Sequence, residues 1–163
     1  EDMAPANVLN RGFGGATIRD VNYYFEQTVS RYHPRAIFFY AGENDVDLGE
    51  SPEEIAADFR AFLALKDEAL GATPVYFVSL KPSRLRFAQY ETQTQVNRLI
   101  RQIARGRRDV HYVDVARAML HHGQPRDIFI EDGLHMNAEG YATWTRIMRP
   151  IAMRNARRAC NAG

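Results

Sequence analysis

Three short runs rich in apolar and aromatic residues recur at nearly constant spacing along the chain, at residues 36–40, 75–80 and 110–115. The first, Ala-Ile-Phe-Phe-Tyr, is apolar throughout, which is typical of a strand that is buried on both faces. The starts of the runs are 39 and 35 residues apart, so each gap has room for a helix. Together with a shorter candidate strand at residues 7–10, they predict an α/β fold with a mostly parallel sheet.

The segments between these runs carry the sequence signals of helices. Ser51, Pro52 and Glu54 give the second gap an N-cap, a first-turn proline and a capping-box acid in register. Gly71 stands where that helix should end, because glycine commonly follows the last helical residue. Two further stripes of apolar residues at helical spacing lie within residues 18–29 and 96–103, and the first of these is the weaker.

A last helix is expected to begin near Asn137. Four residues recur at helical spacing and are expected to face inward: Tyr141, Trp144, Met148 and Ile151. Pro150 should kink or end this helix, since an interior proline removes a hydrogen bond and clashes with the preceding turn. The basic segment 154–163 is expected to fray. The chain is therefore predicted to form a single domain over residues 1–163.

Charge and cysteine content exclude several classes of protein. Lys and Arg number 21 against 20 Asp and Glu, which gives a net charge of +1, so no overall field favours nucleic acid as a partner. The single cysteine, Cys160, excludes an intrachain disulfide and a cysteine-based zinc site. The apolar runs are far shorter than the ~20 residues that cross a bilayer, so stable membrane insertion is not expected.

Polar or glycine-rich loops stand where strand ends and helix starts should gather. These loops are residues 12–17, residues 42–45 and residues 132–137. In an open parallel sheet, the ligand crevice lies beyond the carboxyl ends of the strands. We therefore expect the three loops, although distant in sequence, to face a common crevice.

The residue types in these loops suit acyl transfer. Asp132 and His135 are three residues apart, so the carboxylate can orient the imidazole and stabilise it when it takes up a proton. Asn44 can aim its amide into the crevice, and Gly15 lets a backbone N–H approach a substrate closely. Two such donors can stabilise an oxyanion. Each loop taken alone is equally compatible with an ordinary turn or helix cap.

Taken together and in order, the three blocks resemble the SGNH (GDSL-type) ester hydrolase family. They read Gly-Phe-Gly-Gly-Ala-Thr at 12–17, Gly-Glu-Asn-Asp at 42–45 and Asp-Gly-Leu-His at 132–135. The resemblance implies a flavodoxin-like three-layer α/β/α sandwich. It also implies hydrolysis of a small-molecule ester, short-chain acyl or acetyl esters first, through an acyl-enzyme and without a metal or other cofactor. It assigns the catalytic residues as His135 and Asp132 and the oxyanion hole as Gly15 and Asn44.

The family's first block, which carries the nucleophilic serine, has no counterpart here. Eleven residues precede Gly12 and none of them is serine. No serine of the chain lies in a family nucleophile turn or in a Gly-x-Ser-x-Gly elbow: they are Ser30, Ser51, Ser79 and Ser83. We therefore expect an N-terminally incomplete domain whose first strand and nucleophile come from a segment upstream of residue 1, and which is inactive without that segment.

Other functions stay open. A family member without its nucleophile could bind an ester or a glycan without cleaving it. Gly12 and Gly14 are compatible with a dinucleotide fingerprint, but Thr17 stands at the third glycine position and no acidic residue ends the next strand. A metal site could be sought among four residues, two of them adjacent histidines whose side chains rarely converge on one ion: His111, Asp114, His121 and His122. No metal is expected.

Two aromatic residues, Phe13 and Tyr40, are expected to rim the crevice and to contact an acyl chain or a sugar. The segment 81–90 is expected to lie beside them. The sequence itself leaves oligomeric state and cellular location open. Because many bacterial members of the family are exported, the resemblance implies a periplasmic or secreted protein.

Overall fold

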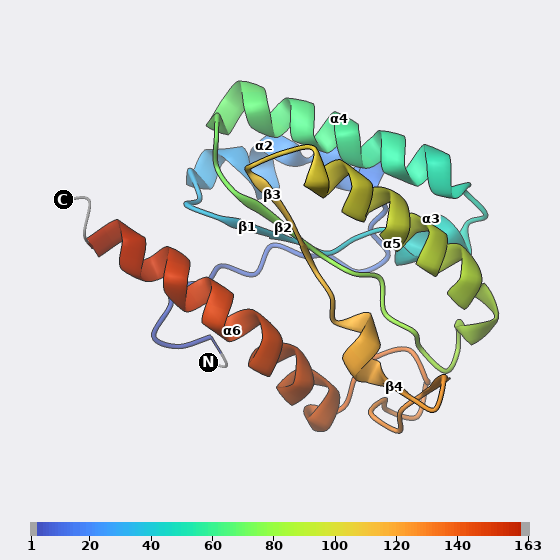
Figure 1. Ribbon diagram of the computed structural model, residues 1–163. Coiled ribbons are helices and arrows are strands. Elements are labelled where there is room, and N and C mark those ends of the chain that lie inside the picture. The colour runs from blue at the N-terminus through green and yellow to red at the C-terminus, as the bar shows by residue number, and fades with distance from the viewer. Residues whose placement is uncertain (1–2, 161–163) are drawn as a thin grey trace.

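Three parallel strands form the centre of the structure and pair in sequence order: β1 (Ile37–Phe39), β2 (Val75–Val78) and β3 (Val110–Val113). The computed structural model describes residues 3–160, with side chains described up to residue 157 (Figure 1). The α-helices are α1 (Ile18–Tyr23), α2 (Phe25–Thr28), α3 (Glu43–Asp47), α4 (Pro52–Leu70), α5 (Tyr90–Arg105) and α6 (Ala138–Cys160). The short 3-10 helices are η1 (Ser30–Tyr32), η2 (Phe87–Gln89) and η3 (Ala116–Met119), and β4 (Leu120–His121) pairs with β5 (Gln124–Pro125) in an antiparallel ribbon.

Alternate residues of the strands face opposite layers, as strand geometry requires. Ile37 and Phe39 of β1 and Phe77 of β2 join a core cluster with buried residues of α4 and α5. Phe38 and Tyr76 face the other layer, where they pack with residues of α6. Figure 1 shows α4 and α5 on one side of the sheet and α6 on the other. The predicted three-layer α/β/α sandwich with a parallel sheet is confirmed.

Helix α4 begins and ends as its sequence predicts. The Ser51 hydroxyl accepts a hydrogen bond from the Glu54 backbone N–H, and the Glu54 carboxylate accepts one from the Ser51 N–H, which completes the capping box. Gly71 follows the last helical residue with a φ of 57°, a conformation that L side chains rarely adopt. These local signals set the position of α4 over the sheet.

The single helix expected within residues 18–29 is instead two short helices. Tyr24, with φ −94° and ψ 19°, interrupts the helical path between α1 and α2. On the two sides of the break, Tyr23 is 79% exposed and Phe25 is buried in the core at 6% exposure.

The strand predicted at residues 7–10 is wrong, because these residues have no strand structure in the described chain. Val8 and Leu9 are 49% and 57% exposed. A strand exists only when a neighbouring strand supplies its hydrogen bonds. Among the residues described, β1 pairs with β2 alone, so its other edge is open and no strand is present there to pair with residues 7–10.

Helix α6 begins at Ala138, next to the expected start at Asn137, and continues through Pro150 to Cys160. Of the two predicted effects of Pro150, to kink or to end the helix, the structure excludes the second. The carbonyl four residues earlier must still lack its helical donor. Tyr141 is 50% exposed, contrary to expectation, whereas Trp144 packs against the core. The segment 154–160 is helical, and residues 161–163 of the expected frayed tail lie outside the described residues.

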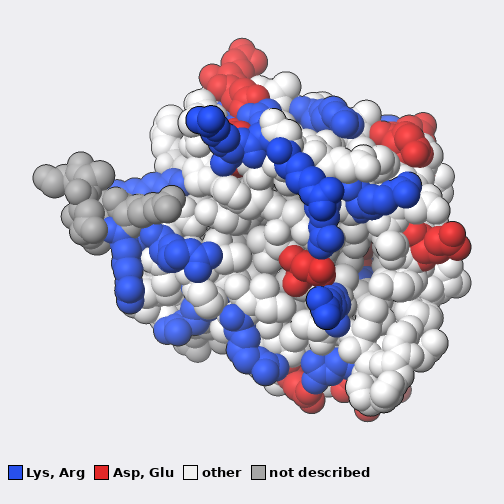
Figure 2. Space-filling view, viewed as in Figure 1, with Lys and Arg blue, Asp and Glu red and all other residues white. Residues whose placement is uncertain are grey.

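No helix within residues 3–160 combines the length and the apolar character needed to cross a bilayer. Figure 2 shows basic side chains scattered over one face of the molecule, with acidic side chains between several of them. In the upper part of this view, several of the basic side chains lie next to one another in a short band.

The first turn of α6 is packed directly on the loop that carries Asp132 and His135. The Asn137 N–H donates to the Ile128 carbonyl at 3.0 Å, and the Asn137 side chain caps the helix by accepting from the N–H of Gly140 at 3.1 Å. A Cβ placed on Gly140 would lie 2.6 Å from the Ile128 carbonyl oxygen. Only glycine therefore lets α6 approach the loop so closely.

This close approach predicts the effect of Gly140→Ala. We expect the free energy of unfolding to fall by about 1–3 kcal/mol, the usual cost of overpacking, because a backbone carbonyl cannot move aside cheaply. The loss should occur although alanine is intrinsically the better helix former by about 1 kcal/mol. Chemical denaturation of the purified protein measures it.

Gly106→Ala is the matched control. A Cβ there would lie 3.5 Å from the nearest oxygen, that of Ile103, which is ordinary contact. Stability equal to or slightly above that of the unsubstituted protein is expected for Gly106→Ala. An equal loss in both variants would contradict the packing argument.

Candidate active site

The glycine-rich loop and α3 are held side by side by two hydrogen bonds. The Asn44 side-chain Nδ2 donates to the Ala16 carbonyl at 2.9 Å. The Ile18 backbone N–H donates to Oδ1 of the fully buried Asp45 at 2.9 Å. Gly15, directly before Ala16, is exposed and has a φ of +75°, which a side chain would strain. The structure thus binds Asn44, one predicted oxyanion donor, to the residue that follows Gly15, the other.

A single glycine allows the chain to turn from β1 into α3. Gly42 has a φ of +120°, and a Cβ on it would lie 3.2 Å from the Leu80 side chain. The backbone conformation therefore favours glycine, and a Cβ would in addition press against the Leu80 side chain. The consequence is that α3, with Asn44 in its first turn, starts directly beyond the carboxyl end of β1.

A buried ion pair lies beneath this turn. The Lys81 ammonium donates to the two Glu43 oxygens at 2.8 and 3.0 Å, and both residues are less than a tenth exposed. The Tyr40 hydroxyl also donates to the Glu43 carboxylate. Removal from water, together with that negative charge, raises the pKa of the Tyr40 hydroxyl well above its usual value, although the residue as a whole is 37% exposed.

Tyr40 was predicted to rim the crevice, and its partly exposed ring lies against Trp144 of α6 with centroids 4.8 Å apart. Phe13, the other predicted rim residue, is 42% exposed and meets Tyr24 edge-on at 5.9 Å. The contact of Tyr40 with Glu43 and Lys81 was not predicted. Nothing in the sequence signals it except that the charged residues follow neighbouring strands.

Asp132 and His135 form the predicted pair. Asp132 Oδ2 lies 2.6 Å from His135 Nδ1, and Asp132 Oδ1 accepts the backbone N–H groups of Leu134 and His135 at 2.8 and 2.9 Å. The hydrogen bond from His135, with these two N–H groups, lowers the pKa of Asp132 to about 2. The carboxylate thus holds one ring nitrogen and leaves Nε2 for a proton from another group. The His135 side chain is 67% exposed.

The loop after β2, residues 81–86, joins the two halves of the site. On one side, the Leu85 N–H donates to the Gly133 carbonyl at 3.0 Å. On the other side, Arg86 Nη1 donates to Asn44 Oδ1 at 3.0 Å. The loops of Asn44 and His135 are therefore connected through one intervening loop, at the carboxyl end of the sheet where ligands bind in such folds.

The four serines all lie elsewhere or have other partners. Ser51 caps α4, and Ser30 begins η1. The buried Ser79 hydroxyl accepts the backbone N–H groups of Val115 and Ala116, each at 3.0 Å, and Ser83 accepts the Arg86 N–H at 3.3 Å. No hydrogen bond joins any serine to the His135 ring among the residues the structure describes. The residues predicted as oxyanion donors, base and acid therefore have no serine hydrogen-bonded to the His135 ring among the residues that the structure describes.

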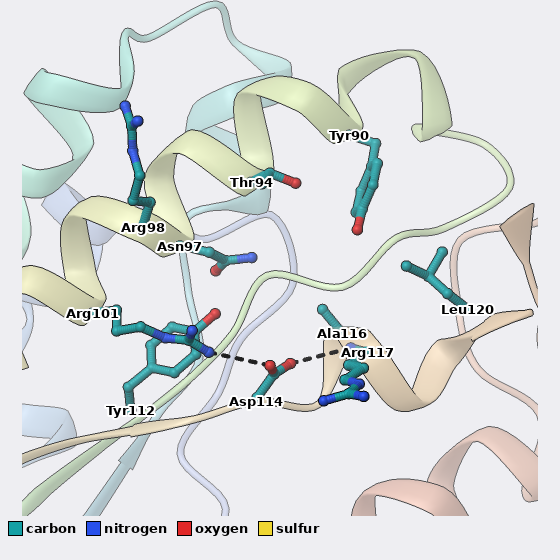
Figure 3. A pocket seen from close by; sticks show the side chains of 10 residues that line it. All are labelled: Tyr90, Thr94, Asn97, Arg98, Arg101, Tyr112, Asp114, Ala116, Arg117 and Leu120. Carbon is teal, nitrogen blue, oxygen red and sulfur yellow. Dashed lines mark hydrogen bonds and ion pairs between the residues drawn. The ribbon is translucent and has the colours of Figure 1, made fainter. Parts of the chain in front are cut away.

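Two cavities of the structure are lined by residues other than these. One, of about 290 Å³, lies between α5 and the segment after β3. Figure 3 shows three arginines at its wall, with Arg101 paired to Asp114 at 3.2 Å: Arg98, Arg101 and Arg117. The other, of about 460 Å³, lies between α4 and α5. Neither is lined by Gly15, Asn44 or His135.

The histidines considered as metal ligands have other neighbours. His111 stacks on Tyr76 at 4.7 Å, and the His121 and His122 rings lie against each other at 4.1 Å. Within the part of the chain that is described, one set of three potential ligands converges, and it was not predicted: Asp45, Glu50 and Asp58. Arg19 pairs with Glu50 and Asp58 at 3.3 and 2.8 Å, so that cluster already has a cation.

A family model described as the GDSL-like Lipase/Acylhydrolase family matches residues 1–143. The match spans all four residues predicted for the site: Gly15, Asn44, Asp132 and His135. Among curated proteins, no sequence matches the chain.

Solved structures share the fold at low sequence identity. A Streptococcus pneumonia protein described as a candidate platelet activating factor has a TM-score of 0.83 and 19% identity, covering 91% of this chain and 74% of its own. A carbohydrate esterase of family 3 from Talaromyces cellulolyticus has a TM-score of 0.76 and 20% identity, and the similarity covers 94% of this chain and 77% of that protein. A catalytic mutant of Axe2, an acetylxylan esterase from Geobacillus stearothermophilus, has a TM-score of 0.72 and 20% identity. This similarity covers 89% of this chain and 71% of that protein. These similarities agree with the predicted flavodoxin-like sandwich.

The Asp132 geometry predicts a titration. We expect the carboxyl NMR signal of Asp132 to titrate with a midpoint at about 2, below the usual value of about 3.9. Because the folded-state pKa is lowered, the paired carboxylate stabilises the loop above about pH 4, and this contribution is lost as the pH falls toward 2.

His135→Ala tests the cause of this shift. It removes the largest contribution, and the midpoint should rise but stay below the usual value, since two backbone N–H groups still donate. A midpoint near 3.9 in the unsubstituted protein would show that the pair is not formed in solution.

Proposed function

The chain belongs to the GDSL-like lipase/acylhydrolase family, a family of ester hydrolases, and we propose that it hydrolyses short-chain acyl or acetyl esters through an acyl-enzyme. The observation that carries the proposal is the connected set of a carboxylate-held imidazole at His135 and an amide donor at Asn44, joined through the 81–86 loop. An imidazole with one nitrogen held by a carboxylate suits general-base catalysis. An amide beside an exposed glycine suits stabilisation of an oxyanion.

Each residue has a role in this proposal. The Asn44 Nδ2 group has two N–H bonds, of which one donates to the Ala16 carbonyl. Its other N–H and the Gly15 N–H donate to the oxyanion that forms when the ester carbonyl is attacked. His135 Nε2 takes the proton of the attacking hydroxyl and returns it to the leaving alcohol, while Asp132 fixes the ring orientation. Loss of one oxyanion donor typically costs about 3 kcal/mol of barrier, or 10²–10³ in kcat.

We assign the nucleophile to a serine on a segment upstream of residue 1 that adds a parallel strand to the open edge of β1. Two features support this assignment. The β1 edge lacks a partner among the described residues, and the exposed apolar residues Val8 and Leu9 could pair with the added strand from its other side. Paired strands would satisfy backbone groups that otherwise cost about 1–3 kcal/mol each when buried. By this proposal, the 163-residue chain is inactive alone.

The proposed substrates follow from the surroundings of the site and from the structural relatives. Phe13 and Tyr40 are partly exposed aromatic residues, which suit contact with an acyl chain or a sugar ring. Two of the structural relatives are a carbohydrate esterase and an acetylxylan esterase. Acetylated carbohydrates are therefore included among the substrates that we propose, together with small acetyl esters.

A non-catalytic module that binds an ester or a glycan is the second candidate function. It is favoured by one observation: no serine among the described residues contacts His135. The two candidates differ in turnover, since a binder retains affinity for an acetylated ligand and releases no acetate.

Turnover of p-nitrophenyl acetate tests the proposal directly. We expect activity from protein that includes the residues upstream of Glu1, and none from the 163-residue chain alone. His135→Ala should abolish the activity, since no other described group is placed to act as base. His121→Ala, which changes an exposed histidine of the β4–β5 ribbon, is the matched control and should retain it.

A fluorophosphonate probe identifies the nucleophile in the same samples. It should label one serine upstream of residue 1, located by peptide mass spectrometry. Binding of an acetylated ligand without turnover or labelling would support the binding module instead. Labelling of Ser79 or Ser83 would overturn the assignment of the nucleophile.

A further inference from the structure

The two ends of the Asn44 amide have opposite partners. The Ala16 carbonyl can only accept a hydrogen bond, and it receives one from Nδ2 at 2.9 Å. The Arg86 guanidinium can only donate, and it donates to Oδ1 at 3.0 Å. An asparagine amide can rotate by half a turn and exchange its N and O ends. Here that rotation would set Oδ1 against the Ala16 carbonyl, two acceptors, and Nδ2 against the Arg86 guanidinium, two donors. The nitrogen end is thereby fixed on the side of the glycine-rich loop.

Arg86 is itself held in place. Its Nη2 donates to Asp47 Oδ2 at 2.8 Å, and Asp47 Oδ1 accepts from the Gln89 side chain at 2.8 Å. The Arg86 side chain is only 12% exposed. Its backbone N–H donates to the Ser83 hydroxyl at 3.3 Å. The guanidinium thus reaches both ends of α3 from a loop that is also tied to Gly133 through the Leu85 N–H.

We propose that Arg86 is the positioning residue of the oxyanion hole, acting through Asn44 and not on the substrate. The proposal rests on the proposed function, since it assigns Asn44 the role of oxyanion donor. Arg86 keeps the amide nitrogen on the side of the glycine-rich loop. Its positive charge beside Oδ1 also withdraws electron density from the amide, which makes the N–H group a stronger donor to a developing negative charge.

Lysine cannot fully replace arginine in this position. The planar guanidinium uses Nη1 for Asn44 and Nη2 for Asp47, whereas an ammonium is a single point of charge. Arg86→Lys should therefore retain the charge but hold the amide less well. Arg86→Met removes both the charge and the donors while keeping an unbranched side chain.

The experiment is a double-mutant cycle on active protein that includes the upstream segment. We expect Arg86→Met to lower kcat for p-nitrophenyl acetate about tenfold and Asn44→Ala about 10²–10³-fold, each with little change in KM. The kcat of Arg86→Lys should lie between those of Arg86→Met and the unsubstituted protein. Because Arg86 acts through Asn44, the double variant should be no slower than Asn44→Ala alone.

Arg101→Met is the matched control. It breaks another arginine–aspartate pair, that of Arg101 with Asp114 at 3.2 Å, in the cavity of Figure 3 away from the site. Its kcat should equal that of the unsubstituted protein. Thermal melts of every variant separate a loss of folding from a loss of catalysis, and the lysine variant carries the test if Arg86→Met unfolds.

A readout without turnover keeps this inference separate from the proposed function. The side-chain amide NMR signals of Asn44 should be resolved and slow to exchange with water in the unsubstituted protein, and they should shift and exchange faster in Arg86→Met. If no esterase activity exists, the proposed function fails while this NMR comparison still decides whether Arg86 holds the amide. Unchanged amide signals, an unchanged kcat, or multiplicative losses in the double variant would each overturn the positioning role.

Discussion

The buried ion pair between Glu43 and Lys81 fixes the carboxyl end of the sheet, and the arrangement of the site depends on it. Its residues follow the neighbouring strands β1 and β2, and both are nearly excluded from water. A buried pair of this kind adds little net stability, but the loss of one partner leaves an unpaired buried charge that costs about 3–5 kcal/mol. The pair therefore resists any displacement of α3 relative to the 81–86 loop, and α3 carries Asn44.

The site combines rigid support with open access. Helix α3, which carries Asn44, has little freedom because of three features: the conformation of Gly42, the fully buried Asp45 and the Glu43–Lys81 pair. Gly15 and the His135 ring, by contrast, are exposed to solvent. Preorganised donors stabilise charge because they need not reorient during the reaction. The same surroundings would also suit a binding module, and what separates the two functions is a nucleophile and not the supporting structure.

Local signals in the sequence predicted much of this structure, whereas contacts between distant segments escaped prediction. The capping box of Ser51 and Glu54 and the Asp132–His135 pair each involve residues three apart, so short patterns reveal them. The strand at residues 7–10 failed because a strand depends on a partner elsewhere in the chain. Arg86 was missed for the same reason, since 42 residues separate it from Asn44 and an arginine in a loop has no local signature of such a role.

The topology also indicates where a nucleophile can be added. Parallel strands present all their carboxyl ends on one edge, so the loops after β1 and β2 meet there with the loop that precedes α6. A serine that follows a further parallel strand would reach the same edge only if that strand joined the sheet. Within the described residues, β1 has a free edge, and β1 is also the strand that leads into Asn44. A strand added there would end beside the residues predicted as oxyanion donors, which is the geometric reason for proposing the nucleophile at that position and at no serine of the chain.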